Sequence, residues 1–299
     1  MREFYGSIEA GGTKWVCAVG SGPDKVEDTT VFATTTPDET IPLVIEYFRS
    51  HHERRSLTAI GIGSFGPLDL DQGSPTYGCI QATPKPDWEN TDLLGKFRNG
   101  LGLPVALETD TNVAVLGEQQ LGAAKGLSDC IYLTIGTGIG GGIIANGELV
   151  HGLCHPEMGH IRIPRGRGDS FSGICPFHGD CLEGLASGPA IEQRWGVAGE
   201  LLEAEHPAWI LQAEYVASAL TNYIFTLAPQ RIILGGGVMR QKKLFPLIRE
   251  SVQQMLSSYF PAIAARTEDY IVGPRLGDRA GICGALELAR RLAGKQLSA

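Results

Sequence analysis

The sequence lacks a long hydrophobic run and a cluster of basic residues. None of its segments approaches the roughly 20 consecutive apolar residues that cross a bilayer, so we expect no membrane association. Its 25 lysines and arginines are outnumbered by 33 acidic residues and form no basic patch, which argues against nucleic acid as a partner. The first residues enter a predicted strand at once, so we expect a cytoplasmic protein with neither a signal peptide nor an upstream DNA-binding module.

Cysteine is sparse and unevenly placed. The seven cysteines are odd in number and scattered, which argues against a disulfide framework and favours reduced thiols with a local metal site. The remaining composition, 43% hydrophobic and 19% charged residues, is that of a globular chain. One segment, 155–183, stands apart because it holds two of the cysteines together with three histidines.

The spacing within this segment predicts a metal site. Cys175, His178 and Cys181 follow one another at intervals of three, and His160 lies fifteen residues before Cys175. Two thiolates and two imidazoles form a closed tetrahedron of the kind that holds structural zinc. We therefore predict a structural Zn²⁺ ion bound by His160, Cys175, His178 and Cys181.

Two glutamates, Glu157 and Glu183, flank the predicted ligands. A rigid metal-bound loop with a carboxylate on each side would suit the binding of a polyhydroxylated molecule. Two alternatives remain open at this point. Cys154 or His155 could replace one of the four ligands, or the segment could be a polar surface loop in which cysteine and histidine are incidental.

The order of the predicted elements indicates two similar halves. Residues 5–20 have the pattern of strand, glycine turn and strand, and residues 130–147 repeat it about 126 residues later. Alternating helix and strand patterns follow each hairpin, which predicts an α/β fold with mixed sheets covered by helices. A single dinucleotide-binding domain is excluded, because the glycines at 136–140 lead into a strand rather than a helix.

We place two domains with a central cleft between them. The first α/β domain covers residues 1–118 and is completed by the helix 280–293, and the second covers 119–279 and carries the zinc loop 155–183. Further helices are predicted at 38–50, 91–100, 112–121, 188–196 and 209–227, and another follows the glycines at 235–237 and ends at about 258. The last helix is predicted at about 279–292. Further strands are predicted at 29–35, 58–63, 104–108, 231–234 and 270–272.

Three glycine runs at strand ends are candidate phosphate-binding turns, because glycine lets backbone N–H groups approach an anion closely. They are Gly11 and Gly12 with Thr13 and Lys14, Gly136 and Gly138 with Thr137, and Gly235, Gly236 and Gly237. The last run could lie against the flat face of a nucleobase. Each run could also be an ordinary turn.

Two acidic residues next to these turns are candidates for chemistry. Glu9 precedes the first turn, where a carboxylate would suit Mg²⁺ that keeps most of its water. Asp110 follows a predicted strand at the start of a helix, which is where open α/β sheets bind ligands. Alternatively, Glu9 is a strand-end acid satisfied by its neighbours, and the segment 108–112 simply supplies an N-cap.

Taken together, these motifs resemble the ROK family of sugar kinases, and among them the zinc-containing bacterial fructokinases. The resemblance covers the whole chain and depends on the segments 8–14, 61–67, 134–140, 155–160, 175–181 and 233–238. It implies two ribonuclease-H-like domains of the actin-like ATPase fold, ATP with Mg²⁺ as phosphoryl donor, and a homodimer.

The resemblance also implies roles for individual residues. Asp110 corresponds to the catalytic base, and the sugar-binding residues correspond to Glu157, His160 and Glu183, with Gly66 and Pro67 beside them. The implied reaction is ATP-dependent conversion of D-fructose to D-fructose 6-phosphate. A glucokinase or mannokinase, or a non-catalytic sugar sensor, would share the same motifs.

The sequence departs from the family pattern at three positions. Glu9 stands where most members have aspartate, and Thr109 stands where many have asparagine, which puts one sugar contact in doubt. His178 replaces a third cysteine, a variant associated with the fructokinases.

Overall fold

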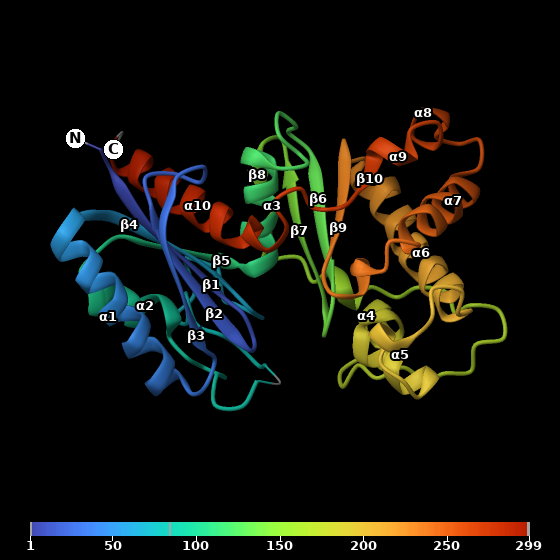
Figure 1. Ribbon diagram of the computed structural model, residues 1–299, viewed down its shortest axis with the longest axis horizontal. Coiled ribbons are helices and arrows are strands. Elements are labelled where there is room, and N and C mark those ends of the chain that lie inside the picture. The colour runs from blue at the N-terminus through green and yellow to red at the C-terminus, as the bar shows by residue number, and fades with distance from the viewer. Residues whose placement is uncertain (1, 84, 298–299) are drawn as a thin grey trace. The chain divides into compact units, whose positions relative to one another are not determined.

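The computed structural model describes residues 2–83 and 85–297 and forms two compact units (Figure 1). Unit 1 consists of Met1–Gly126, Leu149–Pro156 and Arg275–Ala299, and unit 2 of Leu127–Glu148 and Glu157–Pro274. Each unit is therefore built from separate stretches of the chain.

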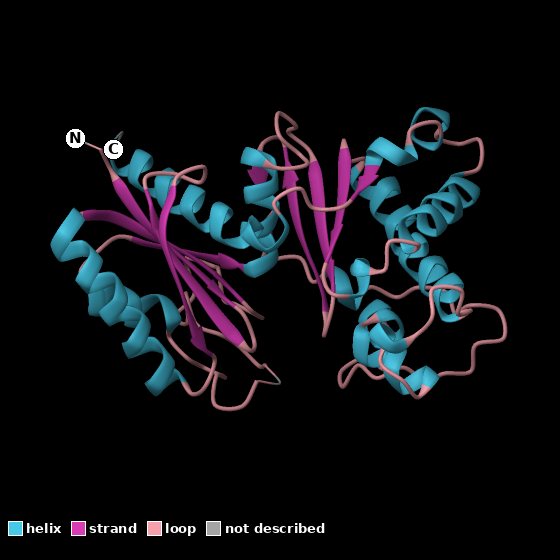
Figure 2. Cartoon of the chain, viewed as in Figure 1, coloured by secondary structure: helices cyan, strands magenta, loops and turns pink. Residues whose placement is uncertain are grey.

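Two five-stranded sheets form the framework (Figure 2). The strands of the first are β1 (Phe4–Ala10), β2 (Lys14–Gly20), β3 (Val26–Ala33), β4 (Leu57–Ser64) and β5 (Val105–Thr109). Those of the second are β6 (Cys130–Ile135), β7 (Ile139–Ala145), β8 (Glu148–Leu149), β9 (Arg231–Gly235) and β10 (Ile271–Val272).

Helices surround these sheets. Unit 1 contains α1 (Pro37–Arg55), α2 (Leu93–Leu101), α3 (Asp110–Leu121), α10 (Ala280–Leu297) and the 3-10 turn η4 (Gly277–Arg279). Unit 2 contains α4 (Leu182–Ala186), α5 (Gly188–Trp195), α6 (Ala208–Leu227), α7 (Leu244–Leu256), α8 (Pro261–Ala264), α9 (Thr267–Tyr270) and the 3-10 turns η1 (Met158–His160), η2 (Gly199–Leu201) and η3 (Val238–Arg240). Among the described helices, none combines the length and apolar character that crossing a bilayer requires.

The two sheets have the same topology. Their strand orders are β3-β2-β1-β4-β5 and, read from the other edge, β8-β7-β6-β9-β10. The first strand of each set is antiparallel to the second and parallel to the fourth. This confirms the predicted pair of like halves, each with the mixed sheet of a ribonuclease-H-like fold.

The three central strands of the unit 1 sheet, β1, β2 and β4, are buried on both faces because they carry apolar residues on both. Cys17 packs in the core formed with α1 and α2, whereas its neighbour Ala18 packs with α10. Glycine in β4 allows α10 to lie close, since a Cβ on Gly61 would stand 2.0 Å from the carbonyl oxygen of Ala285. The last helix thus belongs to the fold of the first strands.

Several element boundaries differ from those predicted. Helix α3 begins at Asp110 rather than residue 112, because the Thr109 hydroxyl accepts a hydrogen bond from the Asn112 N–H at 3.1 Å and caps the helix earlier. Helix α10 continues beyond the predicted end at 292, and β3 lies a few residues earlier than 29–35. The short helices α4, α8 and α9 have no helical periodicity and were not predicted.

Candidate active site and metal centre

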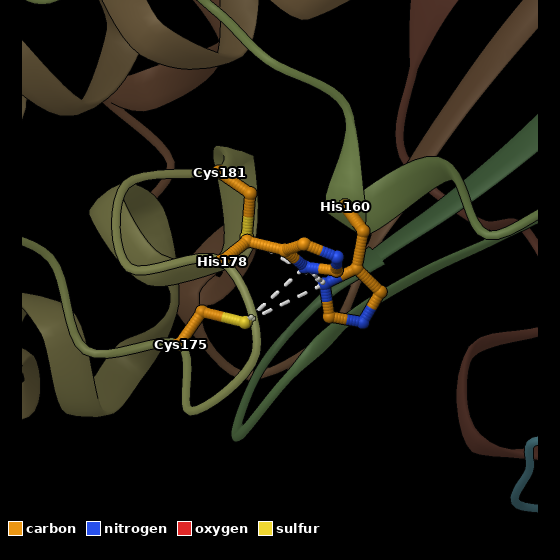
Figure 3. A group of neighbouring side chains, drawn as sticks. All are labelled: His160, Cys175, His178 and Cys181. Carbon is orange, nitrogen blue, oxygen red and sulfur yellow. Dashed lines mark hydrogen bonds between the residues drawn. The ribbon is translucent and has the colours of Figure 1, made fainter.

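Four side chains of unit 2 converge on one point (Figure 3). They are His160 at the end of η1, Cys175, His178, and Cys181 directly before α4, and their donor atoms all lie within 4.8 Å of one another. The sulfur of Cys175 lies 3.7 Å from Nδ1 of His160 and 3.6 Å from Nδ1 of His178. The two Nδ1 atoms are 3.2 Å apart, and the sulfur of Cys181 lies 3.5 Å from Nδ1 of His160.

These four distances are close to the edges of a tetrahedron around one metal ion. With metal–sulfur bonds of about 2.3 Å and metal–nitrogen bonds of about 2.0–2.1 Å, the edges of a tetrahedron measure about 3.3–3.8 Å. Two thiols and two imidazoles are also the donors that such an ion prefers. The four residues named from spacing can therefore hold one metal ion together.

Local backbone geometry creates the metal-binding turn, which we define as residues 175–181. The N–H of Cys175 donates to the carbonyl of Gly179 at 3.1 Å, and the N–H of Gly179 donates back to the carbonyl of Cys175 at 2.9 Å. Gly179 has φ +65°, a conformation that suits glycine. The alternative ligands lie elsewhere, because Cys154 is exposed and Nε2 of His155 accepts the N–H of Leu68 at 3.0 Å.

Glu183 links the metal-binding turn to the glycine turn between β6 and β7. It lies in the first turn of α4, and its Oε2 accepts the N–H of Ile139 at 2.9 Å. A Cβ on Gly138 would stand 2.7 Å from this oxygen, so glycine permits the approach. Burial, reinforced by the charge of Glu183, raises the pKa of Glu157 against the opposing effect of His160.

The second glycine turn borders a cavity of about 730 Å³ in unit 2. Its walls include Gly136, Thr137, Gly237, Arg240 and part of α5. The N–H of Gly188, the first residue of α5, donates to the carbonyl of Gly136 at 2.7 Å and fixes the turn against the helix. A cavity of this size suits a nucleotide-sized ligand.

The three glycines after β9 differ in what they do. A Cβ on Gly236, which has φ +90°, would stand 2.3 Å from the carbonyl oxygen of Ile135, and one on Gly235 would stand 2.3 Å from the hydroxyl of Tyr132. Both are needed for close packing. Gly237 has open space around it and is the member that lines the cavity.

The first glycine turn, in unit 1, is less closely packed than the turn between β6 and β7. The N–H of Gly11 donates to the carbonyl of Lys14 at 3.0 Å, and the Thr34 hydroxyl donates to the carbonyl of Gly11 at 2.7 Å. A Cβ on Gly12 would meet nothing within 4 Å. The ammonium group of Lys85 donates to the carbonyl of Gly12 at 2.5 Å and brings a second positive charge to the turn that carries Lys14.

Glu9 and Asp110 are electrostatically coupled within unit 1. Burial, and secondarily the charge of Asp110, raises the pKa of Glu9 to about 7. Its Oε2 is buried without a hydrogen-bond partner among the described residues, and α10 packs so closely that a Cβ on Gly281 would stand 2.4 Å from Cδ of Glu9. Asp110 occupies the first turn of α3, and its Oδ1 accepts the N–H of Thr111 at 2.7 Å.

A polar group beside Asp110 was not anticipated from the sequence. Buried Glu108 accepts a hydrogen bond from Nδ2 of Asn112 at 2.8 Å and lies 2.9 Å from Nε2 of His151. The hydrogen bond with Glu108 raises the pKa of His151, whereas burial lowers that of His155. No local pattern joins residues so distant in sequence, and the histidines near the metal loop were the only available signal.

Gly66 and Pro67 are joined by a cis peptide bond in unit 1. A Cβ on Gly66 would stand 3.6 Å from the ring of His155, whose Nε2 also holds the N–H of Leu68. The 66–68 backbone and the 149–156 segment are therefore fastened to each other by this ring.

Comparison with known proteins identifies the family. A Bacillus subtilis (strain 168) protein is 53% identical over 290 residues, which is 96% of either chain. The fructokinase of Pediococcus pentosaceus is 45% identical over 289 residues, 96% of this chain and 98% of its own. The solved structure of a ROK family glucokinase from Streptomyces griseus, in complex with glucose and AMPPNP, matches with a TM-score of 0.76 and 27% identity over 96% of this chain and 99% of that one. Since the sequence model of the ROK family also matches residues 5–292, this chain belongs to the ROK family.

Proposed function

We propose that this protein is an ATP-dependent fructokinase that converts D-fructose to D-fructose 6-phosphate. The observation that carries this conclusion is the 45% identity to the Pediococcus pentosaceus fructokinase over almost the full length of both chains. The Streptomyces griseus glucokinase is less similar, at 27% identity. The reaction transfers the γ-phosphoryl group of ATP to a hydroxyl of the sugar and releases ADP.

The glycine turns bind the nucleotide in this proposal. ATP enters the cavity of unit 2, with its base and ribose between α5 and Gly237 and its phosphates toward Gly136, Thr137 and Gly138. The first turn, Gly11, Gly12, Thr13 and Lys14, supplies further N–H groups, a hydroxyl and a positive charge. Phosphoryl transfer depends mainly on such positioning and charge neutralisation.

Asp110 acts as the general base. Its carboxylate accepts the proton of the attacking sugar hydroxyl, a role worth roughly 10²–10⁴-fold in rate. Glu157, His160 and Glu183, with Gly66 and Pro67, bind the sugar. The position of Nδ1 of His160 in the metal cluster supports its dual role, because metal binding at Nδ1 leaves the proton on Nε2 as a donor for a hydroxyl.

Zn²⁺ and Mg²⁺ complete the proposed site. Zinc bound by His160, Cys175, His178 and Cys181 would give the loop a fixed shape and take no part in the chemistry. The cluster of donor atoms and the four short distances between them support this assignment. Glu9 would hold hydrated Mg²⁺, which neutralises phosphate charge; its buried oxygen without a hydrogen-bond partner is consistent with that role.

A coupled ADP-release assay tests the function. We expect turnover with D-fructose to exceed that with glucose, mannose and N-acetylmannosamine. Preference for glucose or mannose would instead establish a kinase of different sugar specificity. Sugar binding without ADP release would establish a non-catalytic sensor. From the family resemblance we also infer a cytoplasmic homodimer, which light scattering would report as twice the chain mass of 32.0 kDa.

The metal is tested by elemental analysis of purified protein. We expect about one zinc per chain, and Cys181→Ala should lose both the zinc and the sugar affinity. Cys154→Ser is the matched control, because Cys154 is exposed and outside the cluster, and it should keep both. A metal-free preparation with full activity would refute the zinc assignment.

A further inference from the structure

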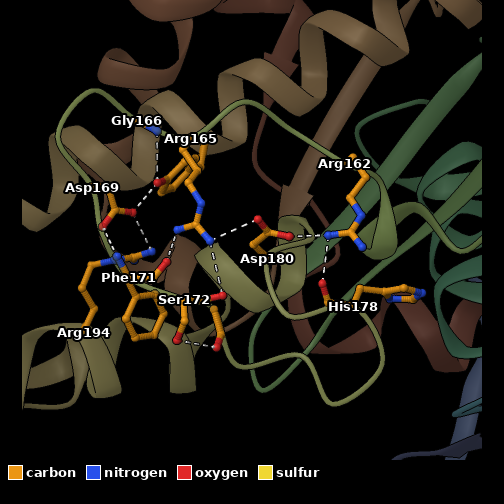
Figure 4. A network of polar contacts seen from close by, with 11 residues as sticks. Arg162, Arg165, Gly166, Asp169, Phe171, Ser172, His178, Asp180 and Arg194 are labelled. Atoms are coloured by element: carbon orange, nitrogen blue, oxygen red, sulfur yellow. Dashed lines mark hydrogen bonds and ion pairs between the residues drawn. The ribbon is translucent and has the colours of Figure 1, made fainter.

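An ion-pair network surrounds the metal-binding turn (Figure 4). Asp180, which lies between the ligands His178 and Cys181, contacts two arginines of the segment that follows η1, Arg162 and Arg165. Its Oδ1 pairs with Arg162, and its Oδ2 lies 3.1 Å from the guanidinium of Arg165. One carboxylate therefore joins the turn to two points on a separate stretch of chain.

Arg162 reinforces the same junction through the backbone. The nitrogen that pairs with Asp180 also donates to the carbonyl oxygen of His178 at 2.9 Å. Arg162 forms an antiparallel bridge with Cys181 as well. The main chains of two metal ligands, His178 and Cys181, are therefore both bonded to Arg162, which in turn pairs with Asp180.

Arg165 extends the network to a buried anchor. It donates to the carbonyl oxygens of Phe171 and, at 3.4 Å, Ser172. These hydrogen bonds close the loop of residues 166–170. The loop is fastened by Asp169, which pairs with Arg194 of α5 and accepts the hydroxyl of Tyr215 of α6.

The anchor differs in burial from the rest of the network. Asp169 and Arg194 are only 9% and 8% exposed, whereas Asp180 and Arg162 are 37% and 62% exposed. Burial acts to raise the pKa of Asp169, but hydrogen bonds from Tyr215 and the Phe171 N–H and the arginine charges lower it on balance. The carboxylate at the base of the loop is therefore stable as an anion.

Exposed ion pairs contribute little to folding stability, so the outer part of the network needs another explanation. A metal site depends on the placement of its ligands and is sensitive to the groups that orient them. We propose that Asp180 is a positioning residue for the metal site: by bridging Arg162 and Arg165 it holds the metal-binding turn in the shape that brings the four donor atoms together. The inference rests on the metal site proposed above.

Zinc affinity provides the test. The full-length protein is stripped with a chelator, and its zinc dissociation constant is measured by competition with a chromogenic chelator. We expect Asp180→Asn, which keeps the size of the side chain but removes its charge, to weaken zinc binding by about 10- to 100-fold. Co²⁺ substituted for zinc should show weaker tetrahedral absorption bands in this variant. The matched control is Glu205→Gln, which removes an exposed ion pair with Lys243 in the same unit and should leave zinc affinity unchanged.

A second variant separates positioning from general stability. Arg165→Gln should also weaken zinc binding. Combined with Asp180→Asn it should cost less than the two single losses together, because both changes break the shared ion pair. An affinity of Asp180→Asn within twofold of the parent, or unchanged Co²⁺ bands, would overturn the proposal. If the parent protein binds no zinc, the metal assignment under Proposed function fails instead, so the two failures are distinguishable.

Discussion

The two units share a strand order but differ at the turn after their first strand. In unit 1 that turn follows Glu9 and contains Gly11 and Gly12, whereas the corresponding positions in unit 2 are Thr134, Gly136 and Thr137. The turn of unit 1 is therefore preceded by a half-buried acid, and that of unit 2 by an uncharged side chain.

The two turns are also supported differently. The turn of unit 1 is held by a threonine hydroxyl on the carbonyl of Gly11. The turn of unit 2 is held by the N–H of Gly188, and Glu183 fixes the strand that follows it. The same strand order thus places an acidic side chain beside the turn of unit 1 and makes the turn of unit 2 part of a cavity wall. Sites with different chemistry can therefore be built on one fold.

The largest effect is expected from Asp110→Asn, which tests whether unit 1 supplies the catalytic base. Turnover should fall by about 10²–10⁴-fold because the sugar hydroxyl loses its proton acceptor. Zinc content and ATP affinity, to which the Asp110 side chain is assigned no contact, should stay unchanged. Asp38→Asn, at an exposed position of α1, is the control. Near-normal turnover of Asp110→Asn would remove this residue from the role.

Glu9, the acid before the first turn, should make folding stability depend on pH. The second turn has no such group, because Thr134 stands at the corresponding position. The pKa of Glu9 is about 7 in the folded protein, against an ordinary value of 4.5, so folding retains a proton that the unfolded chain releases. Without Mg²⁺, stability should therefore fall as pH rises from about 5 to 8, by about 3 kcal/mol at most.

Glu9→Gln should remove this decline, which urea unfolding at pH 5 and pH 8 would measure. Thr134→Val, at the corresponding position of unit 2, introduces no titrating group and should shift stability equally at both pH values. The same pH dependence in Glu9→Gln as in the parent would refute the interpretation.

The glycines after β9 allow a finer comparison within unit 2. Gly236→Ala should destabilise the protein by at least about 1–2 kcal/mol, because φ is +90° and the new methyl group would contact the Ile135 carbonyl. Gly237→Ala should change stability by less than about 0.5 kcal/mol, since the methyl group has space. Thermal or urea unfolding distinguishes them, and equal losses would contradict the structure.

A smaller loss of stability than that of Gly236→Ala is expected at the helix cap beside Asp110. Thr109→Ala removes the hydroxyl that accepts the Asn112 N–H and should cost about 1 kcal/mol. Thr109→Asn should restore the stability, because asparagine is also a good N-cap. Ser187→Ala, which removes the cap of α5 in unit 2, should cost a similar amount. A neutral Thr109→Ala would show that packing alone holds α3.

The sequence was sufficient for the features that repeat or cluster locally. The glycine turns between alternating apolar strands indicated both hairpins, and the spacing of Cys175, His178 and Cys181 indicated the metal cluster. It was insufficient where residues distant in the chain meet. The contact of His151 with Glu108 and that of Glu183 with Ile139 join residues more than forty positions apart, and no local periodicity encodes them.

The packing of α10 against β1, β4 and α3 has a consequence for biosynthesis. The strands of unit 1 leave the ribosome first, but the face that α10 covers stays exposed until residues 280–297 have been translated. The core between this face and α10 therefore closes only after the strands and helices of both units that precede α10 have been made. During that interval, the nascent protein presents an apolar surface around Tyr5, Ala18 and Ala59 that chaperones would be expected to shield.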